Sequence, residues 1–151
     1  MTKRAVLIVA VLGLLVLGGG YFGWKLYSGG QPAFRGRAIP VKGLPEELVE
    51  SWEESFTKAL DDEKVLQLIV DESDYASKLE VSADGAVDHL RKAVRVRVKN
   101  SSKTIEIGLV GKRKEDEDLK GIAKVLYEKA EKKVLEASPS FQDYLDATSK
   151  N

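Results

Sequence analysis

The sequence predicts an α+β fold, in which a small antiparallel sheet carries helices on one face, preceded by one N-terminal transmembrane helix. The first observation is an uncharged apolar segment, Ala5 to Trp24, directly after Lys3 and Arg4. The second is a pair of alternating segments joined by Asn100-Ser101-Ser102, which is typical of a β-hairpin. The third is a series of amphipathic segments whose apolar residues recur at helical spacing.

The apolar segment has the length and the borders of a membrane anchor. At about 1.5 Å per residue, a helix over residues 5–24 spans about 30 Å, the thickness of the hydrocarbon core. The aromatic side chains at its outer end suit the headgroup region, and the basic residues before it favour a cytoplasmic N-terminus. We therefore expect a cytoplasmic N-terminus over 1–4 and an anchor over 5–27 in a bacterial inner membrane. The rest of the chain would be extracytoplasmic.

A cleaved signal peptide is the alternative interpretation of this segment, because small residues at 18–20 follow a basic start and an apolar stretch. The stretch is longer than the usual about 7–15 residues, and no Ala-x-Ala site follows it, so a retained anchor is favoured. Gly19 and Gly23 have the GxxxG spacing that brings two membrane helices into close contact. They are the candidate helix–helix contact in the membrane.

The first part of the domain expected over 34–137 follows a flexible linker over 28–33. A strand is expected over 34–42, and Pro40 restricts it to the edge of a sheet. Pro45 suits the first turn of a helix over 44–60. A second helix should start near Asp61 or Asp62. Residues 71–77 then form its end and a link, and Ser82 caps a third helix that runs to Ala93.

The hairpin is the strongest signal in the second half of the chain. Alternation over 94–99 places valines on one face and cations on the other. The returning strand has the same alternation, with Ile105, Ile107 and Leu109 on its apolar face. Glu106 should pair with Arg95 or Arg97 across the polar face. A long helix from 115–118 onward ends the domain, and a short helix with a polar tail occupies 138–151.

Composition argues against several classes of function. The chain has no cysteine and one histidine, His89, so thiolate sites and the usual zinc sites are excluded. The first acidic residue is Glu46, so all the carboxylates lie in the soluble part, which gives no basic footprint for nucleic acid. Asp61 and Asp62 are adjacent on a helix and point in different directions, which makes a poor catalytic pair. We expect no enzyme activity, no metal and no cofactor.

One surface feature is a candidate binding or interface strip, formed by Arg95, Arg97 and Lys99 on the polar face of the hairpin. A solvated sheet face is the favoured interpretation. The alternative is a site for an anionic ligand.

Several segments resemble the bacterial polysaccharide chain-length-determinant (co-polymerase) family. Residues 34–41, Phe-Arg-Gly-Arg-Ala-Ile-Pro-Val after the apolar segment, resemble its first strand. Residues 60–70, 86–98, and 104–107 with 115–127 resemble its later helices and hairpin. The family usually continues into a long helix and a second membrane helix, which this sequence lacks, so the resemblance covers the membrane-proximal domain.

This resemblance implies an inner-membrane protein whose periplasmic domain oligomerises and has no catalytic activity. Together with the residues, it predicts a non-catalytic single-pass membrane protein with an extracytoplasmic interaction domain, acting in polysaccharide assembly or export. Its expected partners are the lipid bilayer, further copies of itself and other envelope proteins. The alternative is a membrane-tethered binding module for an anionic ligand or a protein partner.

Overall fold

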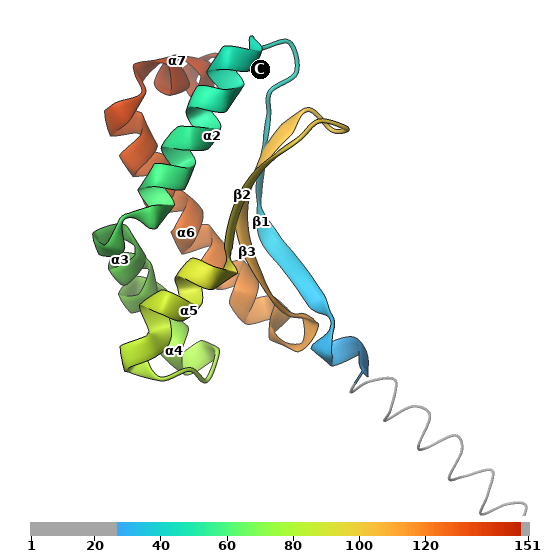
Figure 1. The fold of residues 1–151 in the computed structure, drawn as a ribbon, viewed down its shortest axis with the longest axis vertical. Coiled ribbons are helices and arrows are strands. Elements are labelled where there is room, and N and C mark those ends of the chain that lie inside the picture. Colours follow the sequence, from blue (N-terminus) through green and yellow to red (C-terminus); the bar gives the residue numbers. More distant parts are fainter. Residues whose placement is uncertain (1–26, 149–151) are drawn as a thin grey trace, which may run out of the picture.

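The computed structural model describes residues 27–148, and its α+β architecture confirms the predicted fold class (Figure 1). The sheet is antiparallel, and its third strand in sequence lies between the other two. The strands are β1 (Pro32–Pro40), β2 (Val94–Lys99) and β3 (Thr104–Lys112). The helices are α2 (Glu46–Asp61), α3 (Glu63–Ser73), α4 (Tyr75–Lys78), α5 (Ala86–Ala93), α6 (Asp116–Ala137) and α7 (Pro139–Thr148), with short 3-10 turns at Ala83–Gly85 and Arg113–Glu115.

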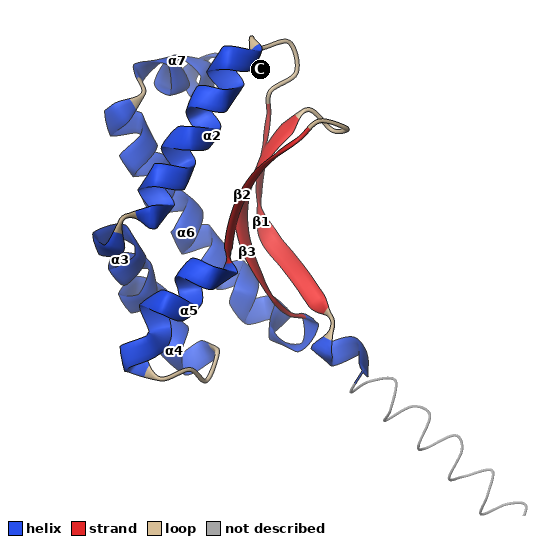
Figure 2. Ribbon diagram, viewed as in Figure 1, coloured by secondary structure: helices blue, strands red, loops and turns tan. Residues whose placement is uncertain are grey.

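The helices lie on one side of the sheet because one face of each strand is apolar (Figure 2). On β3, the central strand, Ile105, Ile107 and Leu109 are fully buried. Trp52 and Phe56 of α2 are fully buried in the same core, as their helical spacing predicted. The buried face of α6 adds a long apolar stripe, formed by Leu119, Ile122, Ala123, Leu126, Ala130 and Val134.

The hairpin has the expected register, with Arg97 opposite Glu106. β1 pairs with β3 alone and is therefore an edge strand, as Pro40 predicted. Pro45 stands at the N-terminal boundary of α2, and the Asp62 carboxylate caps α3 by accepting a 2.9 Å hydrogen bond from the Lys64 amide.

Three local expectations were wrong. Residues 27–30 are helical and β1 begins at Pro32, inside the segment expected to be a flexible linker. The second helix ends within 71–77 as expected, at Ser73, but the expected link is instead Asp74, with a φ of 55°, and the start of α4. Ser82 precedes a 3-10 turn without capping it through its side chain. Tyr75, the first residue of the extra helix, is fully buried in the core.

The C-terminal helix α7 belongs to the same core as the rest of the domain. The Phe141 ring is fully buried and meets the rings of Trp52 and Phe56 edge-on, with centroids 5.0 Å and 5.4 Å away. The domain boundary expected after residue 137 therefore coincides with the end of α6, whose C-cap is Ser138. The helix beyond this boundary has no separate core.

The predicted anchor over 5–27 lies, except for Tyr27, outside the described residues, as do Gly19, Gly23 and the last three residues of the tail. Within 27–148, none of the helices combines the length and the apolar composition that a membrane crossing requires.

β1 and β3 approach closely at the middle of their pairing, where Gly36 lies opposite Gly108. A Cβ atom on Gly108 would lie 2.6 Å from the Cα of Gly36, and closer still to the carbonyl oxygen of Arg35. Real Cβ atoms do not approach backbone so closely, so both positions require glycine for these two strands to pair in this register.

This close approach predicts that Gly108→Ala lowers the free energy of unfolding by about 1–3 kcal/mol, because the new methyl group forces the strands apart. Gly121→Ala is the matched control, since its methyl group would meet nothing nearer than the Lys78 ammonium at 3.9 Å. The control should gain about 0.5–1 kcal/mol from better helix propensity. Thermal unfolding of the full chain in detergent measures both, and equal melting temperatures for the two variants would contradict the close approach.

Candidate functional site

The basic strip of Arg95, Arg97 and Lys99 is exposed, but its cations are already engaged. Arg97 makes an ion pair of 2.7 Å with Glu106, which confirms one of the two expected partners, and Lys99 lies 3.5 Å from the same carboxylate. Arg95 does not pair with Glu106. Its guanidinium donates 2.6 Å hydrogen bonds to the carbonyl oxygens of Lys92 and Val94.

One further contact holds the strip in place. The Arg97 guanidinium lies over the Phe34 ring at 5.2 Å, reaching across the side-chain-free position Gly108. The hydrogen bond from Arg97, with the charge of Lys99, keeps the pKa of Glu106 below its usual value. Glu106 is therefore ionised at neutral pH and offsets part of the strip's charge.

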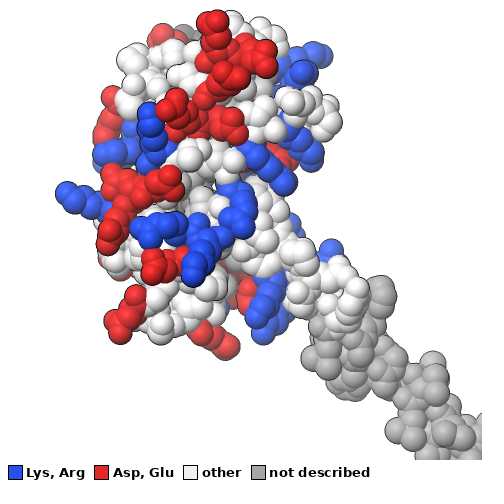
Figure 3. All heavy atoms as spheres, viewed as in Figure 1, with Lys and Arg blue, Asp and Glu red and all other residues white. Residues whose placement is uncertain are grey.

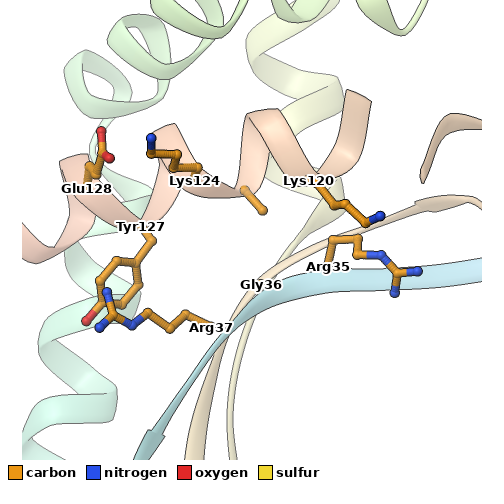
Figure 4. Close-up of a pocket in the computed structure, with 8 residues that line it drawn as sticks. Arg35, Gly36, Arg37, Lys120, Lys124, Tyr127 and Glu128 are labelled. Atoms are coloured by element: carbon orange, nitrogen blue, oxygen red, sulfur yellow. The ribbon is translucent and has the colours of Figure 1, made fainter. Parts of the chain in front are cut away.

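A second group of cations surrounds a hollow of about 380 Å³ between β1 and α6, called here the β1–α6 hollow (Figure 4). The backbone of Gly36 on β1 and the small Ala123 on α6 form part of its wall. The remaining lining residues are Arg35 and Arg37 from β1, and Lys120, Lys124, Tyr127 and Glu128 from α6.

The register of β1 explains why arginines face a helix. Arg35 lies opposite Leu109 and Arg37 opposite Ile107, so both arginines share the sheet face on which Ile39 is buried. An arginine on the core face of an edge strand can extend its guanidinium to the boundary of the core. Figure 4 shows the two guanidiniums diverging from Gly36, Arg35 toward Lys120 and Arg37 toward Tyr127.

One end of the hollow is an ion-pair network. Asp116 at the start of α6 pairs with Arg35 and lies 3.2 Å from the Lys120 ammonium, which is also 2.7 Å from Glu117. Burial acts to raise the pKa of Asp116, but the hydrogen bond from Lys120 and the charge of Arg35 outweigh it, so the pKa lies below its usual value. Asp116 therefore stays ionised and fixes the position of Arg35.

The other end of the hollow has cations that form no ion pair, and the carboxylate of Glu128 also lines it. The Arg37 guanidinium stacks over the Tyr127 ring at 4.5 Å, a cation–π contact that positions it without neutralising it. The Tyr127 hydroxyl donates to Glu131 at 3.1 Å, and burial raises the pKa of Tyr127, so the ring stays neutral. Among the described residues, neither Arg37 nor Lys124 forms an ion pair with a carboxylate.

The backbone of β1 adds a hydrogen-bond donor to the hollow. The amides of Val41 and Arg113 donate to the carbonyls of Lys103 and Gln31, both at 2.8 Å, and these bonds bracket the β1–β3 ladder. Bonded and non-bonded pairs alternate in an antiparallel ladder, so the amide of Gly36 points away from β3. Gly36 lines the hollow, so this outward N–H lies at its border.

The rest of this free edge is protected against pairing with another strand. Pro32 and Pro40 occupy outward-facing positions and have no N–H to donate. The Arg35 side chain donates to the Phe34 carbonyl at 2.8 Å, and the Tyr144 hydroxyl donates to the Pro40 carbonyl. Both ends of the edge are therefore blocked, and its free backbone N–H groups lie at its centre, beside the hollow.

The chemistry available here is binding of an anion. Arginines, lysines and an outward amide are donors, and the lining residues include no serine, cysteine or histidine to act as a nucleophile or base. Within 27–148, no group of three or more His, Asp or Glu side chains is arranged to hold a metal ion. His89 is exposed and its Nδ1 lies 2.8 Å from the hydroxyl of the buried Tyr75, while Asp62 serves as a helix cap.

The chain matches no model of a known protein family, no curated protein and no solved structure. Sequence reasoning missed the β1–α6 hollow. A strand places the side chains of every second residue on one face, and here those residues are Arg35, Arg37, Ile39 and Val41. The available signal was the presence of two cations on the same strand face as the apolar core residues.

Because Glu106 pairs with two cations of the strip, Glu106→Gln should lower the free energy of unfolding at pH 7 by about 0.2–1 kcal/mol, the range of exposed ion pairs. A carboxylate whose folded pKa is lowered stabilises the fold above its unfolded pKa, and that stability disappears as pH falls through the folded value. The difference between the variant and the wild type should therefore shrink below pH 4.5. Thermal melts from pH 7 to pH 3 measure it, and a constant difference would contradict the role given to Glu106.

Proposed function

We propose that this chain is a single-pass inner-membrane protein whose non-catalytic, extracytoplasmic head binds an anionic component of the cell envelope. The observation that carries the proposal is the β1–α6 hollow, where Arg37 and Lys124 have no carboxylate partner among the described residues. The apolar segment Ala5 to Trp24, with Lys3 and Arg4 before it, supports the membrane anchor and its orientation.

This proposal places the anion-binding site at the hollow and not at the strip. The strip has three cations, of which two share Glu106 and the third is bonded to carbonyl oxygens. A ligand at the strip must compete with these contacts. A ligand at the hollow meets a guanidinium that an aromatic ring has already oriented, so less ordering is needed on binding.

The resemblance to polysaccharide chain-length determinants supports the same class of protein, one that acts by association. We propose polysaccharide assembly or export as its process, with further copies of the chain or other envelope proteins as partners. The narrow range of chemistry at the hollow supports an association function over an enzymatic one.

The proposed topology can be tested by cysteine labelling, because the chain contains no cysteine of its own. Ser101→Cys places a thiol in the exposed turn between β2 and β3, and Thr2→Cys places one before the apolar segment. A membrane-impermeant maleimide should label Ser101→Cys in spheroplasts and leave Thr2→Cys unlabelled until the cells are lysed. Labelling of Thr2→Cys alone in intact spheroplasts would reverse the orientation.

The proposed binding site can be tested with dextran sulfate, a general polyanion, and neutral dextran as the control ligand. Reversing Arg37 and Lys124 to glutamate should weaken binding of dextran sulfate by the full chain in detergent at least about tenfold. Reversing Arg95 and Arg97 makes the same change of charge on the other sheet face and should weaken binding less.

Calorimetric titration at two salt concentrations measures both pairs, and thermal melts confirm that both variants fold. If the reversed strip lost binding while the reversed hollow kept it, the site would be the strip. Equal binding of neutral dextran would contradict recognition of charge altogether.

A further inference from the structure

The β1–α6 hollow has the room and the hydrogen-bond donors to receive a phosphate group. It measures about 380 Å³, and Arg35 with Lys120 bounds one end while Arg37 with Tyr127 bounds the other. The Arg37 guanidinium and the Gly36 amide can each donate to a different oxygen of one phosphate group, whereas Arg35 already pairs with Asp116.

The chain itself keeps the hollow close to the membrane. Lys25 follows the apolar segment directly, and ten residues later Arg35 lines the hollow. Ten residues span at most about 35 Å even when fully extended, whatever path the chain takes. Residues 27–30 are helical, which shortens this reach further. If the anchor crosses the bilayer, the phosphate-rich layer nearest to the hollow is therefore the membrane's own headgroup region.

More cations gather where β1 begins. Lys112 pairs with Pro32 across the ladder, and Arg113 and Lys114 follow it on the surface. Figure 3 shows lysine and arginine side chains beside the point where the chain enters the head. Of the carboxylates after them, Glu115 accepts the Lys112 amide at 3.0 Å, while Asp116 and Glu117 pair with the lining cations. Asp118 is the remaining acidic residue on this stretch.

We infer that the β1–α6 hollow binds the phosphate group of an anionic membrane lipid and thereby holds the head against the bilayer. This inference rests on the proposed function and names its ligand. Basic residues near a membrane surface attract anionic lipids, and donors that line an open hollow add directed hydrogen bonds to that attraction. The lipid would fix the orientation of the head relative to its anchor.

The test is native mass spectrometry of the full chain in mild detergent, titrated with phosphatidylglycerol, phosphatidylcholine or soluble glycerol 1-phosphate. The wild type should retain phosphatidylglycerol more strongly than either of the other two ligands. Arg37→Gln should weaken that retention about tenfold, the effect of losing one charge-assisted contact. Arg95→Gln removes the same charge from the other sheet face and should leave retention unchanged.

A second variant keeps the test independent of charge. Ala123→Leu places a larger apolar side chain in the hollow and should also weaken retention, with the charges intact. Retention of phosphatidylglycerol that neither Arg37→Gln nor Ala123→Leu weakens would overturn the inference. Equally tight, Arg37-dependent binding of glycerol 1-phosphate would overturn the lipid as the source of the phosphate.

The two proposals fail in different ways. If binding of dextran sulfate depends on Arg37 and Lys124 but retention of phosphatidylglycerol does not depend on Arg37, the lipid assignment is wrong and the anion-binding head stands. If neither ligand depends on these residues, both proposals are wrong.

Discussion

The pairing of β1 with β3 is the constraint on which the rest of the molecule depends. Its register places Gly36 against Gly108, and the lack of a Cβ at both positions permits that close approach. The same register sends Arg35 and Arg37 toward α6. A shift by one residue would move these two side chains to the open face and would bring Phe34 toward the core. The site is therefore a direct consequence of how one edge strand is paired.

Two groups of cations on this small sheet differ in what surrounds them. Arg97 and Lys99 share the carboxylate of Glu106, whereas Arg37 is held by the Tyr127 ring and keeps its charge available. Exposed ion pairs contribute about 0.2–1 kcal/mol, so neither group is needed to stabilise the fold. What separates them is the availability of their donors to a ligand. Figure 3 also shows carboxylates along α2, on the part of this face that lies away from the entry of the chain.

Much of the architecture could be predicted because its signals are local. Alternating valines marked β2, Pro45 and Asp62 marked helix boundaries, and the apolar spacing of α2 placed Trp52 in the core. The β1–α6 hollow could not be predicted in this way, since it needs the register of β1 and the packing of α6, which are separated by about 80 residues in sequence. The left-handed backbone of Asp74 divides α3 from α4, and aspartate tolerates this conformation better than most residues, but the burial of Tyr75 after it depends on tertiary packing.

The most direct test of the account is titration of the isotope-labelled full chain in micelles with inorganic phosphate, followed by amide NMR. We expect a saturable chemical-shift change that is largest at the amide of Gly36, with smaller changes at the amides of Arg35 and Arg37. Largest shifts at Arg95 to Lys99, or no saturable shift at Gly36, would contradict the claim that the donors of β1 form the binding site.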